Sequence, residues 1–140
     1  MTEGRDVSIA RLPSATLAGK SGLGPLPPFT LRTDPPEGVP HREGIVWDQQ
    51  VVVFVYASDG DLTLYIDDPY PFDQFIQVLN GRTILTDQQG KVESFVVGES
   101  FVLPKNFVGE WQLLDNYREL CVVEAMAFKS SEELGMPDSH

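Results

Sequence analysis

Residues 74–104 read QFIQVLNGRTILTDQQGKVESFVVGESFVLP, and most of the architecture can be inferred from them. Short runs rich in β-branched and aromatic residues alternate here with turn-forming residues, a pattern typical of β-strands with short connections. The predicted strands are Gln74–Leu79, Thr83–Thr86, Val92–Val97 and Ser100–Leu103. The predicted connections are Asn80-Gly81, Asp87–Gly90 and Gly98-Glu99. Asn-Gly is a strong short-range turn signal, so we expect the strand that begins at Gln74 to stop at residues 80–81.

The same pattern continues on both sides of this stretch. Upstream, Val51–Tyr56 predicts a strand that ends in a hairpin turn at Asp59-Gly60, and the alternating run Leu62–Ile66 predicts the next strand. Downstream, Trp111–Leu114 and Glu119–Ala125 complete the series. Eight or nine short strands at spacings of roughly 8–12 residues, without a long helix between them, predict an all-β antiparallel sandwich or barrel.

Composition and charge predict a single acidic domain. The chain has 140 residues and a formal net charge of −11, so we expect neither a nucleic acid nor an anionic membrane as a partner. No apolar stretch is long enough to span a bilayer, and the first residues, MTEGRDVSIA, lack the apolar core of a signal peptide. The single cysteine, Cys121, cannot form an internal disulfide. Together these features predict a cytoplasmic protein.

Proline and glycine usage divides the chain into three parts. Residues 1–43 hold seven of the eleven prolines and predict an extended N-terminal arm, in which Val7, Ile9 and Leu12 are candidates for a short strand. Residues 44–128 carry the strand signals and predict the barrel. Residues 129–140 are polar and predict a short helix or a frayed tail.

Several glycines and one proline fall into a recognisable order. Gly98–Pro104 has the form G-x5-P, which resembles the second conserved motif of the cupins. Residues 75–81, FIQVLNG, resemble the end of the first cupin motif, and Gly109-Glu110-Trp111 resembles the G-x-W of the small ureidoglycine-aminohydrolase-like cupins (the Cupin_3 or DUF861 group). Trp47-Asp48 is similar to the Trp-Glu with which that group enters the barrel. The resemblance implies a single-domain cupin-type double-stranded β-helix, a jelly-roll barrel with an interior pocket.

The resemblance also shows where cupins hold a metal ion, and this sequence lacks those ligands. The metal-binding Glu corresponds to Gln74, and the final His corresponds to Gly109. The paired His positions correspond to Asp67 and Pro69, or to Asp68 and Tyr70. Because imidazole is the ligand that suits transition metals at such sites, we expect no metal and no other cofactor.

Acidic residues near this position leave one alternative open. Asp67, Asp68, Asp73 and Gln74 could offer oxygen ligands to a hard ion such as Mg²⁺ or Ca²⁺. Asp-Asp-Pro at the end of a strand is, however, also ordinary turn chemistry, and we favour that interpretation.

Five residues are candidates for binding a ligand: Trp111, Gln74, Tyr65, Tyr70 and Asp73. Strand alternation turns Trp111 into the barrel, either as a stacking wall or as core. Gln74 is expected to face inward as a hydrogen-bonding group or a satisfied buried amide. The tyrosines offer phenols on an otherwise apolar wall.

Two residues of possible chemical interest are expected to be inert. Cys121 lies in an apolar strand and predicts a buried, inert thiol, because no histidine lies nearby in the sequence to activate it. His41 lies in the Pro-rich arm and is expected to be exposed.

Two functions follow. The first is a binding protein for a small polar or aromatic metabolite. The alternative is a small cupin enzyme, aminohydrolase- or isomerase-like, acting on a small nitrogenous or carbohydrate-derived substrate; a metal-free mechanism would need an acid and a base from Asp67, Asp68, Asp73 or Tyr70. Either function is compatible with a homodimer, which we expect because exposed apolar edge strands favour a partner.

Overall fold

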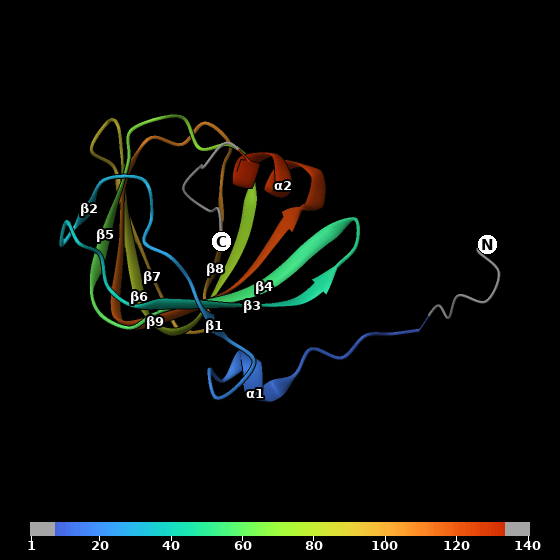
Figure 1. The fold of residues 1–140 in the computed structure, drawn as a ribbon. Helices are drawn as coiled ribbons and strands as arrows, with labels where there is room; N and C mark the ends of the chain where they lie inside the picture. The colour runs from blue at the N-terminus through green and yellow to red at the C-terminus, as the bar shows by residue number, and fades with distance from the viewer. Residues whose placement is uncertain (1–7, 134–140) are drawn as a thin grey trace.

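Antiparallel β-strands form most of the part of the chain that the computed structural model describes, residues 8–133 (Figure 1). The strands are β1 (Gly24–Pro25), β2 (Thr33–Asp34), β3 (His41–Asp48), β4 (Val51–Ser58), β5 (Leu62–Ile66), β6 (Gln74–Asp87), β7 (Val92–Val96), β8 (Ser100–Leu103) and β9 (Gly109–Glu124). The two helices are α1 (Ser14–Leu17) and α2 (Ala125–Glu133). The predicted all-β antiparallel architecture is confirmed.

Two long strands, β6 and β9, lie side by side and organise the barrel. The first half of β6 pairs with β8, and its second half pairs with β7. Likewise, β9 pairs with β5 over residues 109–113 and with β4 over residues 118–124. The sheet therefore has two halves. One half carries β1, β3, β4 and β8, the other carries β2, β5 and β7, and β6 and β9 belong to both.

The predicted end of the strand at Asn80-Gly81 is wrong, because β6 bends there and continues beside β9. Gly81 has a φ of +71°, and a Cβ built on it would lie 2.3 Å from the carbonyl oxygen of Leu114. Only glycine allows the two backbones to approach this closely. β9 bends at the same level, where Asp115 and Asn116 have φ values of 62° and 56°. The Asn-Gly pair thus forms a bulge between two halves of one strand.

The predicted hairpin at Asp59-Gly60 is also wrong. Among the described strand pairs, β4 and β5 never pair with each other, and each pairs with β9 instead. The chain turns a corner between them, where an Asp61 carboxylate oxygen accepts a hydrogen bond from the Asp115 backbone N–H at 2.9 Å. The turn at Asp87–Gly90, in contrast, connects the antiparallel pair β6 and β7, as a hairpin does.

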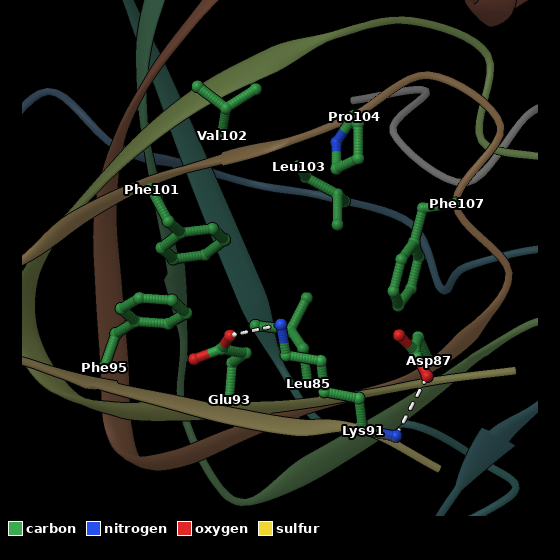
Figure 2. A pocket seen from close by; sticks show the side chains of 10 residues that line it. All are labelled: Leu85, Asp87, Lys91, Glu93, Phe95, Phe101, Val102, Leu103, Pro104 and Phe107. Atoms are coloured by element: carbon green, nitrogen blue, oxygen red, sulfur yellow. Dashed lines mark hydrogen bonds and ion pairs between the residues drawn. The ribbon is translucent and has the colours of Figure 1, made fainter. Parts of the chain in front are cut away.

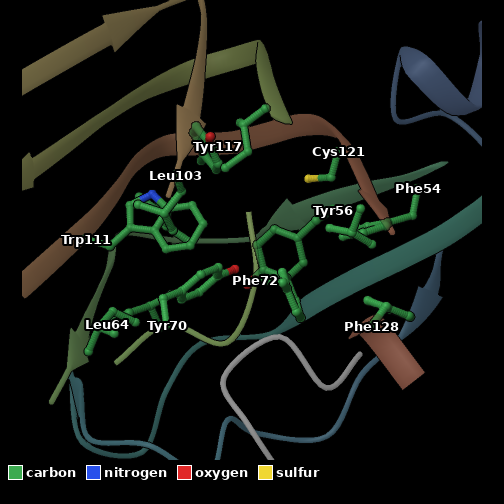
Figure 3. Close-up of a cluster of buried hydrophobic side chains, with 14 of the residues drawn as sticks. Phe54, Tyr56, Leu64, Tyr70, Phe72, Leu103, Trp111, Tyr117, Cys121 and Phe128 are labelled. Atoms are coloured by element: carbon green, nitrogen blue, oxygen red, sulfur yellow. The ribbon is translucent and has the colours of Figure 1, made fainter. Parts of the chain in front are cut away.

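The core lies between the two halves and is rich in aromatic side chains (Figure 3). Phe54, Tyr70, Phe72 and Trp111 are all at most 4% exposed. Helix α2 lies over one end of the barrel (Figure 1). The ring of its Phe128 packs against that of Phe54, with ring centroids 5.5 Å apart. The residues of α2 include Lys129–Glu133 of the predicted tail, and residues 134–140 lie outside the described part. Neither described helix is long and apolar enough to cross a membrane.

The N-terminal segment is attached to the barrel along much of its length. β1 pairs with β3 and β2 pairs with β5, while the carbonyl of Leu17 in α1 accepts a hydrogen bond from Arg118 of β9 at 2.9 Å. The short strand predicted around residues 7–12 is not seen over Ile9 and Leu12, and Val7 lies outside the described residues. β3 begins at His41, before the predicted barrel boundary at residue 44. The division into arm, barrel and tail stays a prediction.

The prediction that His41 is exposed is wrong. Its side chain is buried, and both ring nitrogens have partners: Nε2 lies 2.7 Å from the carbonyl oxygen of Pro27, and Nδ1 lies 2.9 Å from the Tyr56 hydroxyl. The carbonyl can only accept, so Nε2 donates and Nδ1 accepts from Tyr56. Burial lowers the pKa of His41. The imidazole is therefore neutral, and its two hydrogen bonds connect Pro27 of the N-terminal segment to Tyr56 of the barrel.

Candidate ligand-binding site

Three of the five predicted site residues meet inside the barrel. The Tyr70 hydroxyl donates a hydrogen bond to the Oε1 atom of Gln74, and the Tyr70 ring lies edge-on to Trp111 with ring centroids 6.3 Å apart. The indole Nε1–H donates to the Thr83 hydroxyl at 2.9 Å. All three side chains are at most 2% exposed. They form a packed and largely hydrogen-bonded part of the core, with one buried donor, Gln74 Nε2, left without a partner.

The other two predicted residues lie elsewhere. Tyr65 belongs to the outward-facing set of β5, and the guanidinium carbon of Arg32 lies 3.9 Å from its ring centroid. Asp73 is exposed, and its Oδ1 accepts a hydrogen bond from the Lys105 backbone N–H at 2.8 Å. The structure therefore does not bring Tyr65 or Asp73 together with Trp111.

The residues at the positions where the resemblance to cupins implies metal ligands do not fit a transition metal. Tyr70 and Gln74 stand at two of these positions, and their side chains are hydrogen-bonded to each other. Gly109 offers no side chain at a third position. The remaining position holds Asp67 or Asp68, both exposed, and none of the four positions holds an imidazole, the ligand that suits such metals. The carboxylate of Asp67 instead forms an ion pair with Arg32 at 3.3 Å. Among the side chains that the structure describes, residues 8–130, no three from His, Cys, Asp or Glu are grouped to hold a metal ion.

A second polar cluster lies in the core on β9. The Tyr117 hydroxyl donates to Glu119 Oε1 at 2.6 Å, and the Cys121 thiol donates to Glu119 Oε2, also at 2.6 Å. Burial raises the pKa of Glu119 to about 7, against the opposing effect of the two hydrogen bonds. Burial also raises the pKa values of Cys121 and Tyr117, so both stay protonated. The prediction of a buried thiol agrees with this position, but the buried carboxyl beside it was missed.

The signal for this cluster is present in the sequence. Residues 117, 119, 121 and 123 alternate with outward positions, so they share one face of a strand. A glutamate on that face among apolar neighbours predicts a carboxyl with a raised pKa.

A pocket of about 410 Å³ opens between β7 and β8, the two strands that pair only with β6 among the described strands. We call it the β7–β8 pocket; it is lined by Leu85, Asp87, Lys91, Glu93, Phe95, Phe101, Val102, Leu103, Pro104 and Phe107. Its volume is within the range of roughly 300–1,000 Å³ that is usual for small-molecule sites. None of the five predicted site residues lines it.

Aromatic rings form two walls of the β7–β8 pocket (Figure 2). Phe95 and Phe101 stack with ring centroids 4.3 Å apart and an interplanar angle of 15°. Figure 2 shows Phe107 across the open space from this pair, with Leu103 and Leu85 between the two walls. Phe107 is held there by its backbone, because its carbonyl accepts a hydrogen bond from the Tyr70 N–H at 2.9 Å. The walls form a slot that suits a flat apolar group.

Three charged residues form the rim of this pocket: Asp87, Lys91 and Glu93. The ammonium of Lys91 lies 3.4 Å from the Glu93 carboxylate. Asp87 Oδ1 accepts hydrogen bonds from the backbone N–H groups of Gln89 and Lys91, each at 2.9 Å. The pocket thus combines an apolar interior with a polar rim.

Comparison with known proteins places this fold. Residues 66–119 match the EutQ-like cupin domain, Cupin_3. A cupin superfamily protein from Desulfitobacterium hafniense is 10% identical, with a TM-score of 0.51, covering 60% of this chain and 76% of its own. A putative ethanolamine utilization protein Q from Salmonella typhimurium is 14% identical, with a TM-score of 0.50, covering 61% of this chain and 69% of its own.

A third structure, a DUF861 protein of unknown function from Pseudomonas syringae, is 14% identical with a TM-score of 0.56 and covers 72% of this chain and 43% of its own. No curated protein matches the sequence significantly. At these identities the structures show the fold alone. The chain has the cupin jelly-roll fold, and within it residues 66–119 carry the match to the EutQ-like cupin domain.

Proposed function

We propose that the protein binds a small, flat, largely apolar organic molecule in the β7–β8 pocket. The observation that carries this proposal is the slot between the stacked rings of Phe95 and Phe101 and the ring of Phe107. Aromatic rings of a ligand gain both burial and favourable ring contacts in such a space. The proposal keeps the aromatic part of the expected ligand class, drops the polar part, and moves the site away from Trp111 and Gln74.

Binding of a neutral aromatic alcohol, naphthylmethanol, tests the proposal by isothermal titration calorimetry on the full chain. For a ligand of this size we expect a Kd of about 0.1–1 mM. Replacing Phe101 with alanine should weaken binding at least about fivefold, because one wall of the slot is removed. Phe107→Ala provides a second test on a different segment, where a folding defect in β8 cannot explain the result.

Phe75→Ala is the matched control. Phe75 pairs with Val102 in the same β6–β8 ladder but belongs to the outward-facing set, with 41% of its surface exposed. Its removal should leave naphthylmethanol binding unchanged. Absence of binding to the unmodified protein, or equal loss in Phe75→Ala and Phe101→Ala, would refute the proposed site.

A second candidate function is a small cupin enzyme that transfers protons. The observation in its favour is Glu119, whose pKa of about 7 suits a general acid or base at neutral pH. Incubation with a metabolite mixture, followed by NMR, tests it: substrate should disappear with the unmodified protein and persist with Glu119→Gln. Turnover that is unaffected by this substitution would exclude Glu119 as the acid or base. The homodimer and the cytoplasmic location stay predictions.

A further inference from the structure

We propose that the ligand of the β7–β8 pocket carries a cationic, ammonium-type group and that Asp87 receives this group at the rim. The inference rests on the proposed function, because it specifies the class of molecule that enters the same pocket. Three features support it: the bonding of Asp87, the pairing of Lys91, and the position of Phe107.

The Asp87 carboxylate is fixed in place with one oxygen unused. Its Oδ1 atom accepts two backbone hydrogen bonds within the β6–β7 turn. Its Oδ2 atom accepts no hydrogen bond, and the residue makes no ion pair, within the described part of the chain. In Figure 2 one oxygen faces the backbone nitrogen of Lys91, whereas the other points into the pocket next to Phe107. This arrangement presents a pre-organised negative charge to whatever occupies the slot.

Lys91 does not offset this charge. It is the only cation among the described residues that line the pocket, and its ammonium already pairs with Glu93 at 3.4 Å. The rim therefore carries one negative charge more than it carries positive charges, on a chain with a formal net charge of −11. An anionic ligand would meet repulsion here, and a cationic ligand would be attracted.

The ring of Phe107 adds to the same preference. Figure 2 shows the end of this ring pointing towards Asp87, with a face of the ring turned to the open space. A cation placed between a carboxylate and the face of an aromatic ring interacts favourably with both. An aromatic amine would thus place its ring in the slot and its ammonium against Asp87, on the pocket side of the Phe107 ring.

Three probes with the same naphthyl ring test this inference by calorimetry on the full chain at low ionic strength: naphthylmethylamine, naphthylmethanol and naphthoate. We expect the amine to bind about three- to fivefold more tightly than the alcohol, and naphthoate to bind most weakly. Added salt should reduce the advantage of the amine.

Two variants separate a direct contact from the general field of the rim. Asp87→Asn and Glu93→Gln each remove one negative charge, and asparagine keeps an oxygen for the turn hydrogen bonds. Only Asp87→Asn should abolish the advantage of the amine over the alcohol. Naphthoate binding as tightly as the amine, or an unchanged amine preference in Asp87→Asn, would overturn the inference. Failure of all three probes to bind would instead refute the proposed function, so the two failures are distinguishable.

Discussion

The buried carboxyl of Glu119 makes the stability of the protein depend on pH in an unusual direction. Its pKa lies at about 7 in the folded protein and near its ordinary value of 4.5 in the unfolded chain. A carboxyl with a raised pKa favours the folded state while it is protonated. Its stabilising effect is complete below 4.5 and is lost as the pH rises through about 7. The gap between the two pKa values corresponds to about 3 kcal/mol of unfolding free energy.

The substitution Glu119→Gln removes this titration while keeping an oxygen that accepts from Tyr117. Urea unfolding, followed by tryptophan fluorescence, gives the free energy of unfolding of both proteins at about pH 5 and about pH 8. The free energy of the variant minus that of the unmodified protein should rise by about 2–3 kcal/mol over this range. Cys121 and Tyr117 do not contribute, because their pKa values lie above it. The titration of His41 is present in both proteins and cancels.

The absolute stability of the variant does not decide the matter, because glutamine alters packing by an amount that is independent of pH. The change of the difference with pH decides it. Glu110→Gln, at an exposed position on the same strand, is the control and should show no such change. A difference between Glu119→Gln and the unmodified protein that is equal at the two pH values would refute the reasoning.

Three further predictions follow from other contacts. Gly81→Ala should destabilise the fold by about 3 kcal/mol or more. Gly90→Ala, also at positive φ but with open space around it, should cost only about 1 kcal/mol. Thermal denaturation of the two variants compares these costs. Thr83→Val removes the acceptor of the Trp111 indole N–H and should cost about 1–3 kcal/mol in urea unfolding, and unchanged stability would contradict the role of this bond. His41→Phe should abolish a loss of stability that develops as the pH falls below 6.5. The lowered pKa means that the neutral imidazole stabilises the folded state above pH 6.5 and that this stabilisation is lost below pH 6.5. If the loss persisted in the variant, His41 would not be its source.

Strand positions could be predicted from the sequence because alternation is a local property. The segments around Val51–Tyr56, Leu62–Ile66 and Ser100–Leu103 all form strands close to their predicted bounds. The connections at Asn80-Gly81 and Asp59-Gly60 were misjudged because a glycine that permits a hairpin also permits a bend. Whether the chain reverses or continues depends on the distant strand β9, which runs beside both segments.

The site was predictable only in part, for a similar reason. Alternation correctly places Trp111 and Gln74 inside, yet it cannot say whether an inward side chain borders a cavity or fills the core. The β7–β8 pocket depends on how far two edge strands diverge, which no local pattern encodes. Phe95 and Phe101 share the inward face of their strands, but their stacking arises only once β7 and β8 both pair with β6.

The shared strands β6 and β9 have a consequence for how the chain folds. Each half of the barrel uses a segment of both strands, so neither half has a complete sheet until the other forms. A slip of one residue between β6 and β9 would turn inward side chains outward in both halves at once. In the correct alignment, the ring of Trp111 and the carboxyl of Glu119 are buried at the same time. The strands that pair with β9 around them, β4, β5 and β6, are distant from it in sequence. We therefore expect slow folding in a single cooperative transition, as is typical of proteins dominated by non-local strand pairing.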